Sequence, residues 1–214
     1  MKITFISDTH GKHYKTTQDL LPGGDMIIHA GDISNRGLIT EIKDFMDWFG
    51  QLPYKHKIFI AGNHDFGFEA IRNSNEPGIK IHPNVIYLKD ESVTIDGIKI
   101  YGSPWQPWFH DWAFNLHRGE EIAEKWKMIP DDVDILITHG PPHGILDKTE
   151  RLVNAGCEEL YKRVFEVKPK IHVFGHIHEG YGMREIDDVI FINASALDAH
   201  YLYSNKPIEL EFNK

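Results

Sequence analysis

Apolar residues recur along the chain with two different spacings, and each spacing predicts one type of secondary structure. Short runs rich in Ile, Val and Phe, bounded by turn residues, are typical of strands, and spacings of three and four residues are typical of helices. The predicted strands lie near residues 2–7, 26–30, 57–61, 85–88, 92–95, 98–101, 133–138, 171–174, 189–193 and 207–212. The predicted helices lie at about 38–50 and 157–166, with weaker signals near 66–72 and 119–127.

The order of these elements predicts an α/β fold. Strands alternate with helices in the first third of the chain, whereas hairpin-like strands fill the middle and the end, with Asp96-Gly97 as a favourable hairpin turn. This mixture indicates two packed mixed β-sheets flanked by helices, a four-layer α/β/β/α sandwich. No repeat and no linker rich in Pro, Gly or Ser divides the sequence, so we expect residues 1–214 to form a single domain.

Composition and charge narrow the class of protein. No apolar stretch approaches the ~18 residues of a membrane span, and Asp8 follows one short strand, which leaves no room for a signal peptide. A single cysteine, Cys157, cannot form an internal disulfide, so we expect a cytoplasmic protein. The net charge of −9 argues against non-specific nucleic-acid binding, and nothing in the sequence indicates an oligomeric state.

Five of the predicted strands are followed within two residues by a residue that can bind a metal ion. Open α/β sheets bind ligands beyond the carboxyl ends of their strands, so we expect these residues to form one site. They offer carboxylate, amide and imidazole donors but no thiolate, which favours Mn, Fe, Zn, Co or Ni over a purely Ca or Mg site. The candidate ligands are Asp8, His10, Asp32, Asn63, His139, His176 and His178.

The motifs that carry these residues resemble the signature of the calcineurin-like metallophosphoesterase superfamily. They are Asp8-x-His10, Gly31-Asp32, Gly62-Asn63-His64-Asp65, His139 and Gly175-His176-x-His178. Further segments are similar to the metallophosphoesterase-domain-containing (MPPED) group, which is related to class III cyclic-nucleotide phosphodiesterases. These segments span residues 102–107, 138–142, 175–182 and 191–195.

The resemblance implies two divalent ions, manganese first among the candidates, bridged by Asp32. It assigns one ion to Asp8, His10 and His178. It assigns the other to Asn63, His139 and His176. His64 would protonate the leaving oxygen without binding metal, and Asp65 would orient His64. A hydroxide bridging the two ions would then attack phosphorus.

Two further features suggest contacts with substrate. Arg36 stands four residues after Asp32, as an arginine does in related phosphoprotein phosphatases, and a guanidinium suits phosphate; an exposed helix-start arginine is the alternative. With Asn63 and His64 it forms the expected substrate-binding set. The segment 105–112 holds three of the five tryptophans, which either stack on a base or anchor the loop to the core.

These features predict a metal-dependent phosphoesterase, most simply a phosphodiesterase, acting on small phosphodiesters or nucleotides such as cyclic nucleotides. A phosphomonoesterase acting on nucleotides or phosphoproteins is the enzymatic alternative, with Arg36 as its main argument. A weakly active nucleotide-binding regulator is the alternative from another class. His176 argues against it, because some animal relatives carry glycine at this position.

Overall fold

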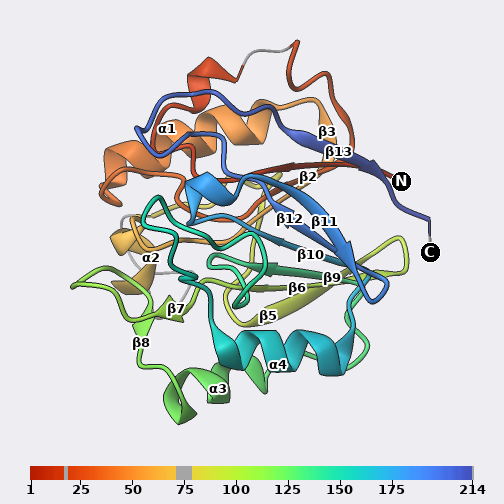
Figure 1. Ribbon diagram of the computed structural model, residues 1–214. Helices are drawn as coiled ribbons and strands as arrows, with labels where there is room; N and C mark the ends of the chain where they lie inside the picture. Colours follow the sequence, from red (N-terminus) through yellow and green to blue (C-terminus); the bar gives the residue numbers. More distant parts are fainter. Residues whose placement is uncertain (17–18, 71–78, 214) are drawn as a thin grey trace.

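The computed structural model describes residues 1–16, 19–70 and 79–213 and contains two large β-sheets that face one another (Figure 1). The first sheet has the strand order β13-β1-β2-β3-β4 and the second the order β11-β12-β10-β9-β6-β5. The strands of the first sheet are β1 (Lys2–Ile6), β2 (Gly24–His29), β3 (Tyr54–Phe59), β4 (Ile86–Tyr87) and β13 (Ile208–Glu211). Those of the second are β5 (Glu91–Ile95), β6 (Ile98–Ser103), β9 (Ile135–Thr138), β10 (Ile171–Phe174), β11 (Gly182–Ile186) and β12 (Val189–Asn193).

Helices cover the outer face of each sheet, which gives the predicted α/β/β/α layers (Figure 1). The helices are α1 (Ile39–Gln51), α2 (Phe66–Ala70), α3 (Glu120–Trp126) and α4 (Glu158–Val167), with short 3₁₀ turns η1 (His13–Lys15) and η2 (His178–Gly180). Residues 71–72 of the helix predicted at 66–72 lie outside the described residues. None of the helices in the described ranges has the length and apolar character needed to cross a membrane.

Alternation along the strands places one apolar set between the sheets and another beneath the helices. In β2, Met26 and Ile28 belong to the core between the sheets, whereas Ile27 packs under α1 with Phe45 and Phe49. In the second sheet the residues Ile171 and Val173 of β10 face inward and Phe174 faces α3 and α4. Because successive side chains of a strand point to opposite faces, the strands contribute to three apolar layers, one between the sheets and one under the helices on each side.

The sequence predicted hairpin-like strands in the middle and at the end of the chain, but the centre of the second sheet is parallel. Its inner strands β6, β9, β10 and β12 are parallel, and the hairpins β5–β6 and β11–β12 only supply the antiparallel edges. The predicted turn at Asp96-Gly97 does form, with positive φ at both residues, as a tight hairpin turn requires. The sequence pattern missed β11 and the small pair β7 (Gln106–Pro107) and β8 (Asn115–Leu116).

Two buried histidines in these layers predict how stability depends on pH. Burial lowers the pKa of both His29 and His172 to about 3, whereas histidine ordinarily titrates near 6.5. The unfolded chain therefore gains protons below pH 6.5 that the folded chain does not bind. Above pH 6.5 the two neutral histidines cost the folded protein nothing. As the pH falls from 6.5 toward 3, each histidine lowers the free energy of unfolding by up to about 1.4 kcal/mol per pH unit.

We expect the free energy of unfolding of metal-free protein, measured with urea, to fall steeply between pH 6.5 and pH 4.5. His172→Phe replaces one titrating ring by a ring that cannot titrate. Below about pH 5.5 its slope should be smaller by about 1.4 kcal/mol per pH unit. Identical slopes in the two proteins would contradict a neutral, buried His172.

Candidate metal centre

The predicted ligands lie at the carboxyl ends of parallel strands in both sheets, where the two sheets meet. Asp8 and His10 follow β1, Asp32 follows β2, and Asn63 follows β3. His139 follows β9 of the second sheet, and His176 and His178 follow β10. A hydrogen bond from Nδ1 of His139 to the carbonyl oxygen of Ala30, 3.0 Å long, joins the strand ends of the two sheets. The site is therefore assembled from residues far apart in sequence.

Strained backbone turns aim four of these side chains into the site. Asp8, His10, Asp32 and His176 have φ values of 52°, 43°, 55° and 68°. Such left-handed conformations cost roughly 1 kcal/mol or more per residue and are retained where the surrounding structure enforces them. Four of the seven candidate ligands therefore have a left-handed backbone conformation, which the structure also contains at turns away from the site.

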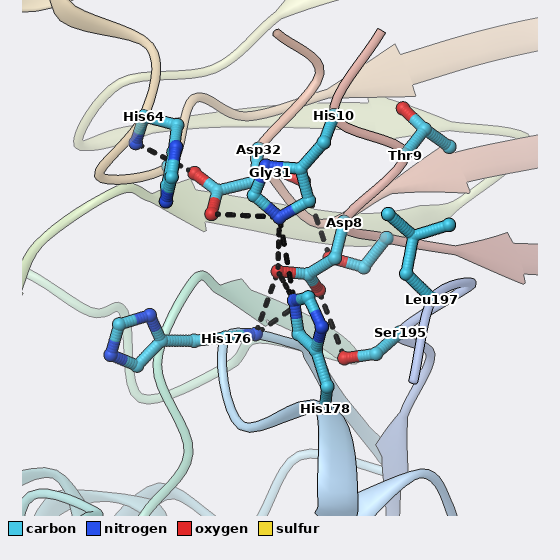
Figure 2. A network of polar contacts seen from close by, with 12 residues as sticks. Asp8, Thr9, His10, Gly31, Asp32, His64, His176, His178, Ser195 and Leu197 are labelled. Carbon is cyan, nitrogen blue, oxygen red and sulfur yellow. Dashed lines mark hydrogen bonds and ion pairs between the residues drawn. The ribbon is translucent and has the colours of Figure 1, made fainter. Parts of the chain in front are cut away.

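The first cluster contains Asp8, His10 and His178. The Nε2 atoms of the two histidines face each other at 3.3 Å, and Asp8 Oδ1 lies 3.5 Å from His178 Nε2 (Figure 2). Two nitrogens that each lie about 2.1 Å from one ion are about 3.0–3.4 Å apart. The spacing of these donors therefore suits a single transition-metal ion.

The second cluster contains Asp32, His139 and His176. The Nε2 atom of His139 lies 3.4 Å from Asp32 Oδ2 and 2.9 Å from Asn63 Oδ1. Asp32 Oδ2 is also 3.6 Å from His10 Nε2 in the first cluster. One carboxylate oxygen thus lies between both clusters, the position that a bridging ligand needs.

Backbone carbonyls fix which nitrogen of three histidines faces the site. Nδ1 of His139, His178 and His64 lies 2.9–3.0 Å from the carbonyl oxygens of Ala30, Asp198 and Asn35. Because a carbonyl only accepts, each Nδ1 carries the donated proton and Nε2 is left for the site. Histidines in metal sites are commonly held in this way.

The charges at the centre are strongly coupled. Burial by itself would raise the pKa of the Asp8 and Asp32 carboxyls, but the neighbouring histidines, His178 for Asp8 and His139 for Asp32, hold both below the usual range. Burial likewise opposes protonation of His139 and His178, yet Asp32 and Asp8 raise their pKa to about 9. Both carboxylates are therefore ionised at neutral pH, and a bound cation would displace histidine protons.

Asp65 differs from its expected role beside His64. Its buried carboxylate accepts hydrogen bonds from the backbone N–H groups of Gly62, Ile33 and Ser34 and from the Ser34 hydroxyl. The ring of His64 is held by the Asn35 carbonyl instead. These hydrogen bonds tie the loop after β2 to the loop after β3. Asp65 therefore supports His64 by fixing the backbone of these loops and not by contact with the imidazole.

A cavity of about 730 Å³ opens beside the clusters. A nitrogen of His64 lies within 4.8 Å of donor atoms of His10 and Asp32. The His64 ring packs on Trp112, with ring centres 4.2 Å apart. The cavity is lined by Asp32, Asn63, His64, His176 and His178 at the metal centre, and by Trp108, Phe109, Trp112, Thr149, Arg151 and Tyr201 around it.

The structure places the tryptophans of the segment 105–112 in two different environments. Trp105 anchors the loop, because its indole N–H donates to Asp90 at 2.9 Å and its ring packs on Phe114. Trp108 is 53% exposed and lines the cavity. The anchoring alternative therefore holds for Trp105, and stacking of a substrate group on Trp108 stays a prediction.

The cationic side chains at the cavity differ from the one predicted. Arg36 is exposed and is absent from the described residues that line the cavity, where Arg118 and Arg151 are found instead. Arg118 binds Glu158 and the carbonyl oxygens of Ala155 and Gly156. Sequence reasoning also missed Tyr201, whose ring centre is 5.0 Å from His10, because an aromatic residue in a loop belongs to no motif and gives no signal.

A family model described as calcineurin-like phosphoesterase matches residues 1–180. The chain belongs to this family. The metallophosphoesterase domain-containing protein 1 of Homo sapiens is 43% identical over 96% of this chain and 69% of its own length. A UPF0046 protein of Caenorhabditis elegans is 38% identical over 97% of this chain and 74% of its own length.

Solved structures share the calcineurin-like fold at low identity. One aligns with 99% of this chain and 99% of its own, with a TM-score of 0.69 at 16% identity. The phosphopantetheinyl hydrolase of Mycobacterium tuberculosis aligns with a TM-score of 0.58 at 15% identity, over 94% of this chain and 90% of its own. These likenesses concern the fold alone. Family membership and the Asp/His clusters together identify a metal-dependent phosphoesterase.

The glycine before His176 provides a test of the first cluster. A Cβ at Gly175 would collide with the Asp8 carboxylate and with the Ser7 side chain. Gly175→Ala should therefore displace Asp8 and remove at least one bound ion after dialysis against Mn²⁺, measured by elemental analysis. Gly24→Ala is the control, because its Cβ would meet its nearest neighbour at 3.6 Å. Equal metal content in the two variants would contradict the packing of Gly175 against Asp8.

Proposed function

We propose that this phosphoesterase hydrolyses small phosphodiesters, cyclic nucleotides among them. The observation that carries the proposal is the cavity of about 730 Å³ continuous with the donor clusters. A diester carries a second organic arm that needs room beside the scissile phosphate. Trp108 and Phe109, which are 53% and 58% exposed, offer that arm an aromatic wall.

The donor set supports two divalent ions, with manganese first and iron, zinc, cobalt or nickel as alternatives. Asp8, His10 and His178 would hold one ion. Asn63, His139 and His176 would hold the other, and Asp32 would be shared. When bound, such a pair supplies Lewis-acid charge for the phosphoryl group and lowers the pKa of a water molecule to about neutrality.

His64 is the proposed general acid. Its Nδ1 donates to Asn35, so the proton that it transfers to the leaving oxygen is carried on Nε2. The Trp112 ring and the hydrogen bond to Asn35 limit rotation of the imidazole. Its place at the cavity wall, next to Asp32 and Asn63, supports a contact with substrate.

The position of Arg36 and the single cysteine bear on the ester class and on the location of the enzyme. The phosphomonoesterase reading relied on Arg36, and the exposed position of Arg36 does not favour it. We place the enzyme in the cytoplasm, because its single cysteine cannot form an internal disulfide. Cys157 is a buried free thiol, and burial raises its pKa to about 11. Such a thiol is chemically inert.

The ester class is tested with chelator-stripped enzyme reloaded with Mn²⁺. We expect bis-p-nitrophenyl phosphate to exceed p-nitrophenyl phosphate in kcat/KM by about tenfold or more, that is, by about 1.4 kcal/mol of transition-state binding. The 2′,3′- and 3′,5′-cyclic forms of AMP are run alongside, and Asp32→Ala should show neither turnover nor bound metal. A preference for the monoester would favour the phosphatase reading, and two bound ions without turnover would favour a regulator.

Replacement of the proposed acid should separate chemistry from metal binding. His64→Ala should retain both ions and lose about 10²–10⁴ in kcat on diesters with poor leaving groups, with a smaller loss on p-nitrophenyl esters. His200→Ala, at an exposed histidine, is the control and should keep wild-type rates. Loss of an ion from His64→Ala would instead make His64 a ligand.

A further inference from the structure

Two fully buried histidines with no role in the proposed mechanism stand behind the metal centre. His29 ends β2 and His172 lies in β10. Nε2 of His29 is 3.0 Å from the hydroxyl of Thr9, and Nε2 of His172 is 2.8 Å from the hydroxyl of Thr138. We propose that each histidine is a positioning residue: His29 acts through Thr9 on the first cluster, and His172 acts through Thr138 on the second.

The sequence positions of the two threonines make the pairing specific. Thr9 lies between Asp8 and His10, and Thr138 directly precedes His139. Each threonine is fully buried, so its hydroxyl needs a partner inside the protein. Each pair therefore anchors the backbone next to the ligands of one cluster.

Thr9 is held in the middle of a strained turn. Asp8 and His10 on either side have positive φ, and their N–H groups donate to the carbonyl oxygens of Gly31 and Asp32. Figure 2 shows Thr9 directed away from the cluster that Asp8 and His10 enter. The bond to His29 fixes the one side chain of this turn that points away from the site. Loss of that bond would let the turn relax and move both ligands.

The hydroxyl of Thr138 has a defined direction. It donates to the carbonyl oxygen of Gly140 at 2.7 Å, so it accepts from His172, whose proton is on Nε2. The hydroxyl thereby connects β10 to Gly140. Thr138 and Gly140, the residues on either side of His139, are thus fixed by one pair of hydrogen bonds. Nδ1 of His172 has no hydrogen-bond partner among the described residues, which leaves the bond to Thr138 as the polar contact of this ring.

Both imidazoles are packed into the outer apolar layers. The ring of His29 meets Phe45 edge-on with ring centres 5.1 Å apart, and the ring of His172 meets Phe174 at 5.0 Å. An apolar side chain would fill either place at a lower desolvation cost. The threonine bonds account for a polar ring at each place, one beneath α1 and one on the face of the second sheet that α3 and α4 cover.

The experiment measures Mn²⁺ affinity by calorimetry in proteins with only one intact cluster. The inference rests on the proposed metal-binding role of the clusters and not on the ester class. His176→Ala leaves the first cluster, and His178→Ala leaves the second. Thr9→Val removes the hydroxyl at constant shape and should weaken binding about 10- to 100-fold in the His176→Ala background. In the His178→Ala background it should change binding by less than about twofold.

Thr138→Val should give the opposite pattern, and Thr9→Ser and Thr138→Ser should keep the affinity of their parent proteins. If a valine variant fails to fold, it is combined with His29→Leu or His172→Leu, which leaves no buried ring without its partner. Equal losses in both backgrounds, or no loss, would overturn the inference. Wild-type protein that binds two ions but cleaves no diester would defeat the proposed function alone.

Discussion

The burial of two ionised carboxylates is the constraint on which the centre depends. Asp8 and Asp32 are 0% and 1% exposed, and an uncompensated buried charge costs several kcal/mol. Asp8 accepts hydrogen bonds from the His176 N–H and the Ser195 hydroxyl, and Asp32 accepts one from the His64 N–H. The donors come from loops that follow strands of both sheets. Compensation of these charges therefore dictates how the two sheets meet.

Other features of the loops follow from the need to bring several side chains from different strands close together at the metal centre. Loops that leave parallel strand ends must turn at once, and Asp8, Asp32 and His176 do so with positive φ. Close approach also excludes side chains, as at Gly175 against Asp8. The extensive apolar layers between the sheets and under the helices stabilise the fold against this local strain.

The sequence predicted features that are local in the chain. An apolar run followed by Asp or His marks a strand end, and the sheet then gathers these ends, so the clusters were predictable as a set. The edge strand β11 was not, because Met183, Arg184 and Glu185 are all exposed and show no alternation. The parallel centre of the second sheet depends on the connection from β6 to β9, which passes through α3, and strand patterns alone do not specify it.

The contacts of individual side chains were harder to predict. Asp65 is next to His64 in sequence, yet its carboxylate faces backbone donors of another loop, and Asn35 holds the ring. Arg36 and Arg151 are equally plausible phosphate contacts by residue type, and only Arg151 lines the cavity. Such choices depend on side-chain rotamers and loop paths, which a single sequence does not encode in any periodic pattern.

The shared position of Asp32 has a thermodynamic consequence. Its Oδ2 atom lies close to His10 Nε2 of the first cluster and to His139 Nε2 of the second. A cation bound in one cluster must therefore change the free energy of cation binding in the other. Reciprocity requires the factor to be the same in both directions. Two cations held by the two clusters would therefore be thermodynamically coupled, and titration with a metal would report a coupling free energy between them rather than two independent affinities.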